Sequence, residues 1–347
     1  MKSPTIYIVT PCRNAAKTIN ETITSVVTQQ GSFFIRYHIQ DCNSSDETLE
    51  ILEKWRLLLT TNSFSISCLG IDFTYASEQD SGLYDGVKKG FEHCDLQDDN
   101  AFMTYLNADD ILINGAFSSI TDIQMMLPDI AWVTGRPCQY AGNSLVYIDP
   151  VFKYPTFLIK NGYCESRFLG YFIQQEGTFW KVKLWNSAIG INADLKFAGD
   201  FDLWVRFARQ ELLWIFNGPL GVFRVREGQL SENLDKYFNE INSVVDFDYK
   251  EKNWQSNIQE IYTSPDKLEN SSAEIVYDYS NKKYIKNITE FPIKNYISIA
   301  TPNDGIVEPL PILNSLPQKR VLQRLIKRTV KYIIPYGLVK MYQNRRH

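Results

Sequence analysis

Residues 101–112, AFMTYLNADDIL, join a nearly all-apolar run to an amide and two adjacent carboxylates: Asn107, Asp109 and Asp110. An apolar run of this kind predicts a strand that is covered on both faces, as in a parallel sheet. Two neighbouring carboxylates repel each other and are poorly suited to a buried strand end unless a cation compensates them. The stretch therefore predicts a buried parallel strand that ends beside a cation.

The chain before residue 101 alternates between β-rich and helical patterns. Short β-rich runs occur at residues 5–11, 37–42 and 70–78. Each run is followed by a segment with apolar residues at helical spacing, at residues 15–30, 43–55 and 81–94. This alternation predicts an α/β fold with a Rossmann-like, doubly wound, mostly parallel sheet.

Polar clusters follow all four predicted strands, at residues 11–14, 41–45, 78–80 and 107–110. In doubly wound sheets, ligands bind outside the carboxyl ends of the strands, so we expect these loops to meet at one acidic edge. Carboxylate oxygens select Mg²⁺ or Mn²⁺, which need few protein ligands when phosphates and water fill the other positions. Asp109 with help from Asp110 is the predicted metal site. The alternative is that one of the pair caps the following helix and the other is solvated.

The composition is that of a folded globular protein. The chain has 347 residues, of which 44% are hydrophobic and 22% charged, so it has room for one large domain with an appendage, or for two domains. No apolar run approaches the ~20 residues of a membrane-spanning helix, and the N-terminus does not read as a secretory signal. We therefore expect a cytoplasmic protein or one at the inner face of the cell membrane. Six widely spaced cysteines and only three histidines argue against a zinc site and against a disulfide framework.

Basic residues gather at the C-terminus. Residues 318–347 hold nine Lys or Arg and no Asp or Glu, so the rest of the chain carries 27 basic against 40 acidic residues. The tail has the pattern of a basic amphipathic helix at an anionic membrane surface; packing on the acidic body or on a second subunit of a homo-oligomer is the alternative. The acidic body argues against nucleic acid as a partner. We predict a catalytic domain over residues 1–235, an extension over 236–300 and a Pro-rich linker over 301–317.

Six blocks of the chain, in this order and approximate spacing, resemble the family-2 glycosyltransferases with the GT-A fold. They are IVTPCRNAAKTINETITSVVTQQ (8–30), IQDCNSSDETLEIL (39–52), SEQDSGLYDGVKKGF (77–91), TYLNADDIL (104–112), QQEGTFWKVKLW (174–185) and AGDFDLWVRFAR (198–209). The resemblance covers roughly residues 4–231 and implies an α/β GT-A fold with a C-terminal helical extension. It also implies inverting transfer of a sugar from a nucleoside diphosphate donor, with UDP favoured, to a glycan or lipid-linked acceptor in bacterial surface polysaccharide assembly.

The resemblance assigns roles to particular residues. Asp200 resembles the catalytic base, although it could instead cap a helix, and Asp202 is an alternative carboxylate. The NADD stretch resembles a D-x-D motif, so Asp109 and Asp110 are expected to hold Mn²⁺ or Mg²⁺ against the diphosphate. A divalent cation stabilises the departing diphosphate, and a carboxylate takes the proton of the attacking hydroxyl. The expected nucleotide-sugar contacts are Pro11, Arg13, Asn14, Asp41, Asp80, Asp85, Asn107, Ala108 and Asp109.

The acceptor segment and the departures from the family pattern complete the assignment. Residues 174–180 resemble the part that frames the acceptor, which assigns Glu176 and, as a ring for sugar stacking, Trp180. Asn107 puts a neutral amide at the first acidic position of the motif. Arg226 stands where relatives often carry His, so we hypothesise that it contacts the diphosphate directly.

Two other functions remain open. A nucleotidyltransferase acting on sugar phosphates would use a similar edge and metal, but it should show a glycine- and lysine-rich phosphate loop near the first strand, which TPCRNAAKT lacks. A non-catalytic protein that binds nucleotide sugars could retain the same fold. Turnover of a donor would distinguish it from an enzyme.

Overall fold

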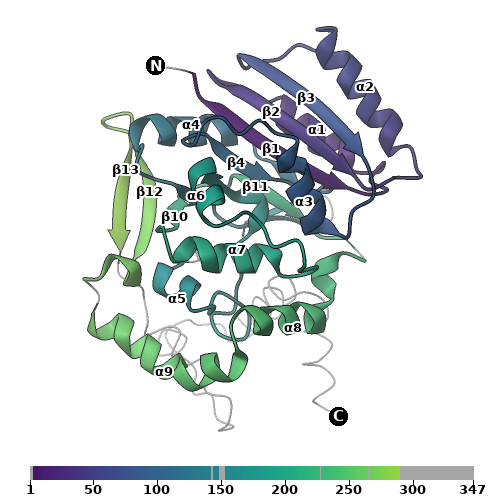
Figure 1. Cartoon of the computed structure of the whole chain (residues 1–347). Helices are drawn as coiled ribbons and strands as arrows, with labels where there is room; N and C mark the ends of the chain where they lie inside the picture. The colour runs from purple at the N-terminus through teal and green to yellow at the C-terminus, as the bar shows by residue number, and fades with distance from the viewer. Residues whose placement is uncertain (1–2, 142–143, 148–152, 227, 265, 290–347) are drawn as a thin grey trace, which may run out of the picture.

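The computed structural model describes residues 3–141, 144–147, 153–226, 228–264 and 266–289. The predicted linker at 301–317 and basic helix at 318–347 lie outside these residues. Within them the chain forms two sheets and flanking helices (Figure 1). None of the helices in the described part combines the length and the hydropathy that crossing a bilayer requires.

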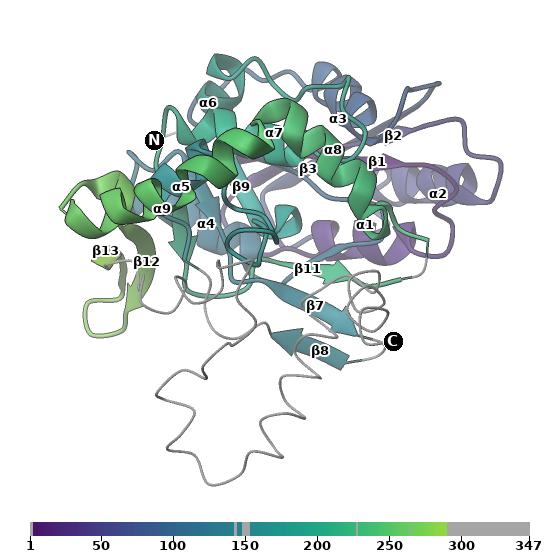
Figure 2. The ribbon, with the colours of Figure 1, turned by 90° about the horizontal axis from the view of Figure 1, so that it is seen from below.

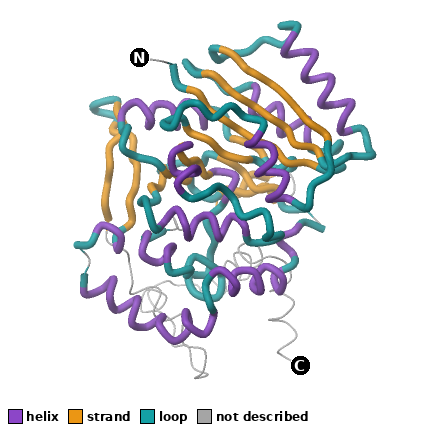
Figure 3. The backbone as a smooth tube through the Cα atoms, viewed as in Figure 1, coloured by secondary structure: helices purple, strands orange, loops and turns teal. Residues whose placement is uncertain are grey.

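A nine-stranded mixed sheet forms the centre of the described part (Figure 3). Its strands, in spatial order, are β13 (Lys283–Thr289), β12 (Ser272–Asp278), β10 (Trp214–Phe216), β6 (Trp132–Thr134), β9 (Thr178–Lys181), β4 (Phe102–Tyr105), β1 (Thr5–Cys12), β2 (Phe34–Asp41) and β3 (Gly70–Ser77). Only β9 and β13 run antiparallel to their neighbours. The predicted α/β fold with a mostly parallel sheet is confirmed.

A second, four-stranded sheet lies on the lower side of the molecule (Figure 2). Its strands, in order, are β5 (Ile111–Leu112), β11 (Gly221–Arg224), β7 (Cys138–Ala141) and β8 (Ser144–Tyr147). β5 begins directly after the NADD stretch and pairs with β11. This pairing brings the residues that follow β11 close to the predicted metal site.

Helices cover both faces of the central sheet because its strands carry apolar side chains on both sides. In β1, Tyr7 and Val9 belong to one core cluster, whereas Ile6 and Ile8 belong to the other. The first cluster includes residues of α3 (Leu83–Glu92), α5 (Thr156–Lys160), α6 (Val182–Ser187), α7 (Gly199–Ala208) and α9 (Phe247–Thr263). The second includes residues of α1 (Ile19–Val27), α2 (Thr48–Thr60) and α4 (Ala116–Met126).

The region predicted as an extension contributes to the central sheet. It begins with α8 (Leu234–Val244), which packs on α7 through Ile241. β12 then pairs with β10 in parallel, and β13 closes the edge of the sheet. Short 3-10 turns lie at η1 (Gln175–Gly177), η2 (Leu230–Glu232) and η3 (Leu268–Asn270). The described part of this region is thus continuous with the body of the protein.

Candidate active site

The four loops predicted to meet at one edge do lie side by side. β1, β2 and β3 end in register, with Cys12 paired to Asp41 and Asp41 paired to Ser77. β4 lies on the other side of β1, with Tyr105 opposite Val9, so residues 107–110 leave the sheet at the same edge.

Asp41 supports this edge from inside the protein. Its side chain is fully buried, and its carboxylate accepts hydrogen bonds from Ser44 N (2.9 Å) and Ser77 Oγ (2.6 Å). Asn14 joins the same loop, because its N–H donates to Ser44 Oγ (2.7 Å) and its side-chain oxygen accepts from Ser45 N (2.8 Å). Asp41 therefore holds the loop in shape rather than presenting its carboxylate at the surface.

The loop between β3 and α3 places two further predicted residues. Pro11 and Asp80 lie against Gly86 of α3: a Cβ added there would be 3.1 Å from Asp80 Oδ2 and 3.3 Å from Pro11 Cβ. Asp85 accepts hydrogen bonds from the backbone N–H (2.8 Å) and the hydroxyl (3.0 Å) of Ser81. Glycine at position 86 thus allows the first and third loops to approach each other.

Asp110 is tied into the protein interior. Its two carboxylate oxygens accept from Arg224 N (2.9 Å) and from Asn107 Nδ2 (3.0 Å), and its side chain is buried. Burial, followed by the charges of Glu176 and Asp109, raises the pKa of Asp110 well above its usual range. Asp110 therefore holds β11 and Asn107 in place, and its predicted role as a metal ligand stays a prediction. Ala108 is buried in the turn between these residues.

Asp109 is the carboxylate of the NADD stretch that reaches the surface. Its side chain is 16% exposed, and it forms an ion pair with Arg226, whose side chain is 51% exposed. The backbone N–H of Arg226 donates to Gln229 Oε1 at 2.7 Å. Arg13, the other cationic residue predicted at this edge, is exposed. Arg226 thus supplies part of the positive charge that we predicted beside the adjacent carboxylates Asp109 and Asp110.

Asp200 lies in the first turn of α7 with a fixed orientation. Its Oδ1 accepts from the backbone N–H of Phe201 (2.8 Å) and is 3.1 Å from the hydroxyl of Tyr84 in α3. Burial raises the pKa of Asp200 from its ordinary value of 3.8 to about 6. The alternative carboxylate, Asp202, instead forms an ion pair with Arg206 at 2.7 Å. Of the two, Asp200 is the one suited to accepting a proton.

Glu176 adds another carboxylate to the same region. It is buried in η1, where its Oε1 accepts from Gln174 Nε2 at 2.7 Å. Burial raises the pKa of Glu176 above its usual range, and the charges of Asp200 and Asp109 raise it further. Asp109, Asp110, Glu176 and Asp200 are therefore close enough to interact, and together they favour a positively charged partner.

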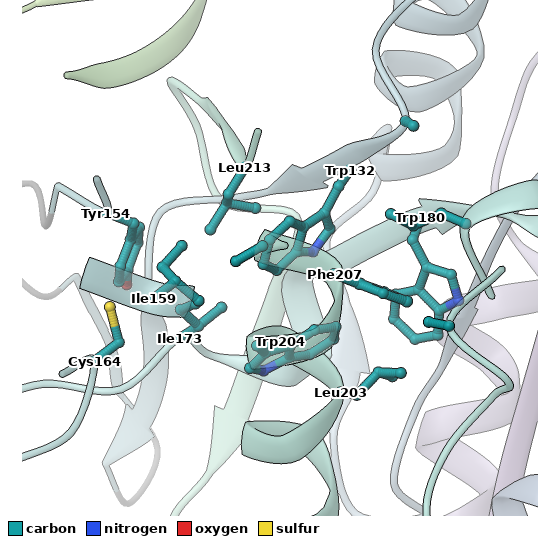
Figure 4. Close-up of a cluster of buried hydrophobic side chains, with 14 of the residues drawn as sticks. Trp132, Tyr154, Ile159, Cys164, Ile173, Trp180, Leu203, Trp204, Phe207 and Leu213 are labelled. Atoms are coloured by element: carbon teal, nitrogen blue, oxygen red, sulfur yellow. The ribbon is translucent and has the colours of Figure 1, made fainter. Parts of the chain in front are cut away.

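Trp180 does not lie at a surface. Its side chain has no exposed area, and its ring packs against Trp204 with centroids 5.5 Å apart (Figure 4). Its ring also stacks on Trp185, with centroids 6.1 Å apart. A ring without exposed surface cannot stack on an acceptor sugar, so this assignment is corrected. Trp180 belongs to β9, whose four residues are all buried. Side chains on either face of this strand therefore lie in the core, the Trp180 ring among them.

Part of the chain matches a known protein family. Residues 7–146 match the model described as "Glycosyl transferase family 2". Over these residues the chain matches a family of glycosyltransferases. The matched residues run from within β1 to within β8 and therefore include all four loops of the acidic edge. No curated protein sequence matches the chain.

Solved structures include similar chains. Staphylococcus aureus TarS (residues 1–349) is 14% identical, covering 77% of this chain and 80% of that one, with a TM-score of 0.47. The same protein in complex with UDP-GlcNAc is 13% identical, covering 77% and 81%, with a TM-score of 0.47. The mannosyltransferase PcManGT from Pyrobaculum calidifontis, in complex with GDP-Man and Mn²⁺, is 12% identical, covering 77% and 76%, with a TM-score of 0.48.

The oxygen atoms at the acidic edge fit a lightly coordinated divalent metal. Asn107 Oδ1 is buried and lacks a hydrogen-bond partner among the described residues. The neighbouring Asp109 reaches the surface. The described residues hold no group of three or more His, Cys, Asp or Glu side chains that could enclose an ion. Mg²⁺ and Mn²⁺ suit such a site, because one or two protein oxygens suffice when a diphosphate supplies the rest.

Tyr84 and Glu240 contribute to the candidate site, but neither belongs to a sequence motif that would have identified it. Tyr84, which contacts Asp200, is buried in α3 and reads in the sequence as one member of an amphipathic helix. Glu240 in α8 accepts hydrogen bonds from the segment that leads into α7. Both contacts join segments that are far apart in the sequence, so only the folded structure brings them to the site.

Proposed function

We propose that this glycosyltransferase transfers a sugar from a nucleoside diphosphate donor to an acceptor hydroxyl with inversion, using Asp200 as the general base. The observation that carries the proposal is the carboxylate of Asp200, which is oriented by two neighbours and has a pKa near 6. A base with this pKa is ionised at neutral pH and accepts a proton more readily than an ordinary aspartate.

The geometry of Asp200 indicates which atom acts. Phe201 N and the Tyr84 hydroxyl both lie against Oδ1, so we assign Oδ2 as the atom that takes the proton of the acceptor. As the acceptor oxygen attacks the anomeric carbon, its proton moves to Oδ2, and the bond to the diphosphate breaks on the opposite face. A single displacement of this kind inverts the anomeric configuration and needs no covalent intermediate.

The donor would lie along the acidic edge. Asn107 and Asp109 would hold Mn²⁺ or Mg²⁺, which as a Lewis acid stabilises the negative charge of the departing diphosphate. Arg226, now paired with Asp109, would turn to the diphosphate, since guanidinium groups bind phosphate oxygens well. The loops held by Asp41, Asp80 and Asp85 would frame the base and ribose of the nucleotide, which we propose is UDP.

The acceptor and the cellular role follow the family resemblance. We propose a glycan or lipid-linked acceptor in bacterial surface polysaccharide assembly, with Glu176 in the segment that would frame the acceptor. A lipid-linked acceptor would suit an enzyme at the inner face of the membrane. Contact through residues 318–347 stays a prediction, because these residues lie outside the described part.

A donor screen tests the proposal. Thermal shifts with nucleoside diphosphates and their sugars, with and without Mn²⁺, should identify one stabilising donor, and that donor should then be consumed in the presence of acceptor. Asp200→Asn should keep donor binding and lose turnover. Asp202→Asn is the matched control, because Asp202 lies on the same helix but is not the proposed base. This variant should keep most of the turnover.

The alternative functions give different results in the same assays. Donor binding without turnover of any sugar would favour a non-catalytic binding protein. Release of pyrophosphate from a nucleoside triphosphate and a sugar phosphate would favour a nucleotidyltransferase. Near-normal turnover by Asp200→Asn would remove Asp200 as the base.

A further inference from the structure

A carboxylate of α8 binds three consecutive backbone N–H groups just before α7. Glu240 Oε1 accepts from Lys196 N at 2.8 Å, and Oε2 accepts from Phe197 N at 2.7 Å and Ala198 N at 2.8 Å. These hydrogen bonds are charge-assisted and therefore stronger than neutral ones. Ala198 is the residue that precedes the first turn of α7, so Glu240 fixes the backbone where this helix begins.

The segment that Glu240 holds also contacts the residues around Asp200. The Tyr84 hydroxyl lies 3.0 Å from Phe197 O and 3.1 Å from Asp200 Oδ1. A tyrosine hydroxyl has one proton, so Phe197 O and Asp200 Oδ1 share a single donor. A shift of the backbone at Phe197 would therefore change how Tyr84 orients and stabilises the carboxylate of Asp200.

We propose that Glu240 is a positioning residue for the transfer reaction: it fixes residues 196–198 and through them the orientation of Asp200. The inference rests on the proposed role of Asp200 as the base. Glu240 touches neither substrate nor the reacting atoms in this scheme, and it lies outside the residues that the family model matches.

The packing around Glu240 allows its charge to be removed without loss of the fold. α8 lies beside α7 (Figure 2), and Ile241 of α8 shares a buried apolar cluster with Ala198, Phe201 and Val205. These contacts do not depend on the carboxylate. A neutral glutamine at position 240 would still accept hydrogen bonds at one oxygen, but its amide group would oppose one of the three N–H donors.

The charge of Glu240 also affects the proton affinity of Asp200. Burial is the main cause of the raised pKa of Asp200, and the negative charge of Glu240 raises it further. Loss of that charge should lower the pKa of Asp200. The other titratable groups that interact with Asp200 from packed elements are Tyr84 of α3, Tyr105 of β4, Glu176 of η1 and Tyr237 of α8. Glu240 is also among the charges that raise the pKa of Tyr237, but burial is the main cause there, so this tyrosine stays neutral when Glu240 is replaced.

The test compares kcat as a function of pH for the full chain and three variants, per mole of folded protein. Glu240→Gln should lower kcat on the order of tenfold, as expected for a displaced catalytic group, and should move the acidic limb of the profile to lower pH. Glu240→Asp keeps the charge but shortens the side chain, so it should lower kcat with a smaller movement of the limb. Asp235→Asn removes a charge from an exposed position of the same helix and should change neither.

The outcomes separate this inference from the proposed function. An unchanged kcat in Glu240→Gln, or a lowered kcat with an unmoved acidic limb, would overturn the positioning role. If Glu240→Gln fails to fold, Glu240→Asp takes its place, and an unchanged kcat in that variant would overturn the positioning role. Asp200→Asn is measured in parallel: if it remains active, the proposed base is wrong, whereas its inactivity beside a normal Glu240→Gln rejects only the role of Glu240.

Discussion

Replacing Asp200 by asparagine should make the protein inactive and should change the pH dependence of its stability in a calculable way. The substitution keeps an oxygen that accepts from Phe201 N and Tyr84, but it removes the ionisable group. Loss of a general base lowers the rate by about 10²- to 10⁴-fold. The same carboxylate is costly to ionise inside the protein, so its removal has a second effect that depends on pH.

The raised pKa of Asp200 determines how large the pH-dependent change in stability is. Burial raises it from 3.8 to about 6, so the folded protein binds this proton more tightly than the unfolded chain. The stability from this group is fully present below pH 3.8 and is lost as the pH rises through about 6. At about 1.4 kcal/mol per pKa unit, the total loss is about 3 kcal/mol, of which roughly 1.5 kcal/mol falls between about pH 5 and pH 8. For 347 residues, 1.5 kcal/mol corresponds to about 2 °C in Tm.

Urea unfolding at these two pH values provides the assay. The stability of Asp200→Asn relative to the unaltered protein should increase by roughly 1.5 kcal/mol from pH 5 to pH 8. Glu176 titrates in both proteins, but the charge of Asp200 raises its pKa, so the substitution also lowers the pKa of Glu176 and adds to the difference in the same direction. If the two proteins lose stability in parallel over this range, Asp200 does not have a raised pKa, and the reasoning for its role as the base fails.

Three further substitutions test the site. Arg226→Ala should weaken UDP binding by about 10- to 100-fold in calorimetry, because a charged hydrogen bond of about 1.5–3 kcal/mol is lost, and should leave uridine binding unchanged; equal UDP affinity would remove Arg226 from the diphosphate site. Trp180→Ala should cost about 3–5 kcal/mol of stability in urea unfolding, with the acceptor KM of the folded enzyme unchanged, and a raised KM would return Trp180 to the acceptor site. Tyr84→Phe removes a hydrogen bond that lowers the pKa of Asp200, so the acidic limb of kcat should move to higher pH; movement in the other direction would contradict this contact.

The fold class was predictable because its signals are local. The alternation over residues 5–94 gives the order of strands and helices, and the apolar run at 101–106 indicates a strand buried on both faces. The predictions of a mostly parallel α/β sheet and of a family-2 glycosyltransferase are confirmed. β12 and β13 were missed for a physical reason. β13 is an edge strand whose residues are mostly exposed, so it carries little of the apolar pattern by which a strand is recognised.

The same distinction applies to the candidate site: its motif residues could be predicted from the sequence, but their surroundings could not. A motif identifies a carboxylate such as Asp109 or Asp200 because the chemistry requires that residue type at that position. It does not identify what surrounds the carboxylate: the hydroxyl beside Asp200 belongs to a residue 116 positions earlier in the chain. Burial and these distant neighbours determine the pKa of Asp200, and hence the pH range in which it can act as a base. Two relatives with the same motif residues can therefore differ in pH dependence when the residues equivalent to Tyr84 and Glu240 differ, and the paired shifts expected for Tyr84→Phe and Glu240→Gln, in opposite directions, measure that contribution directly.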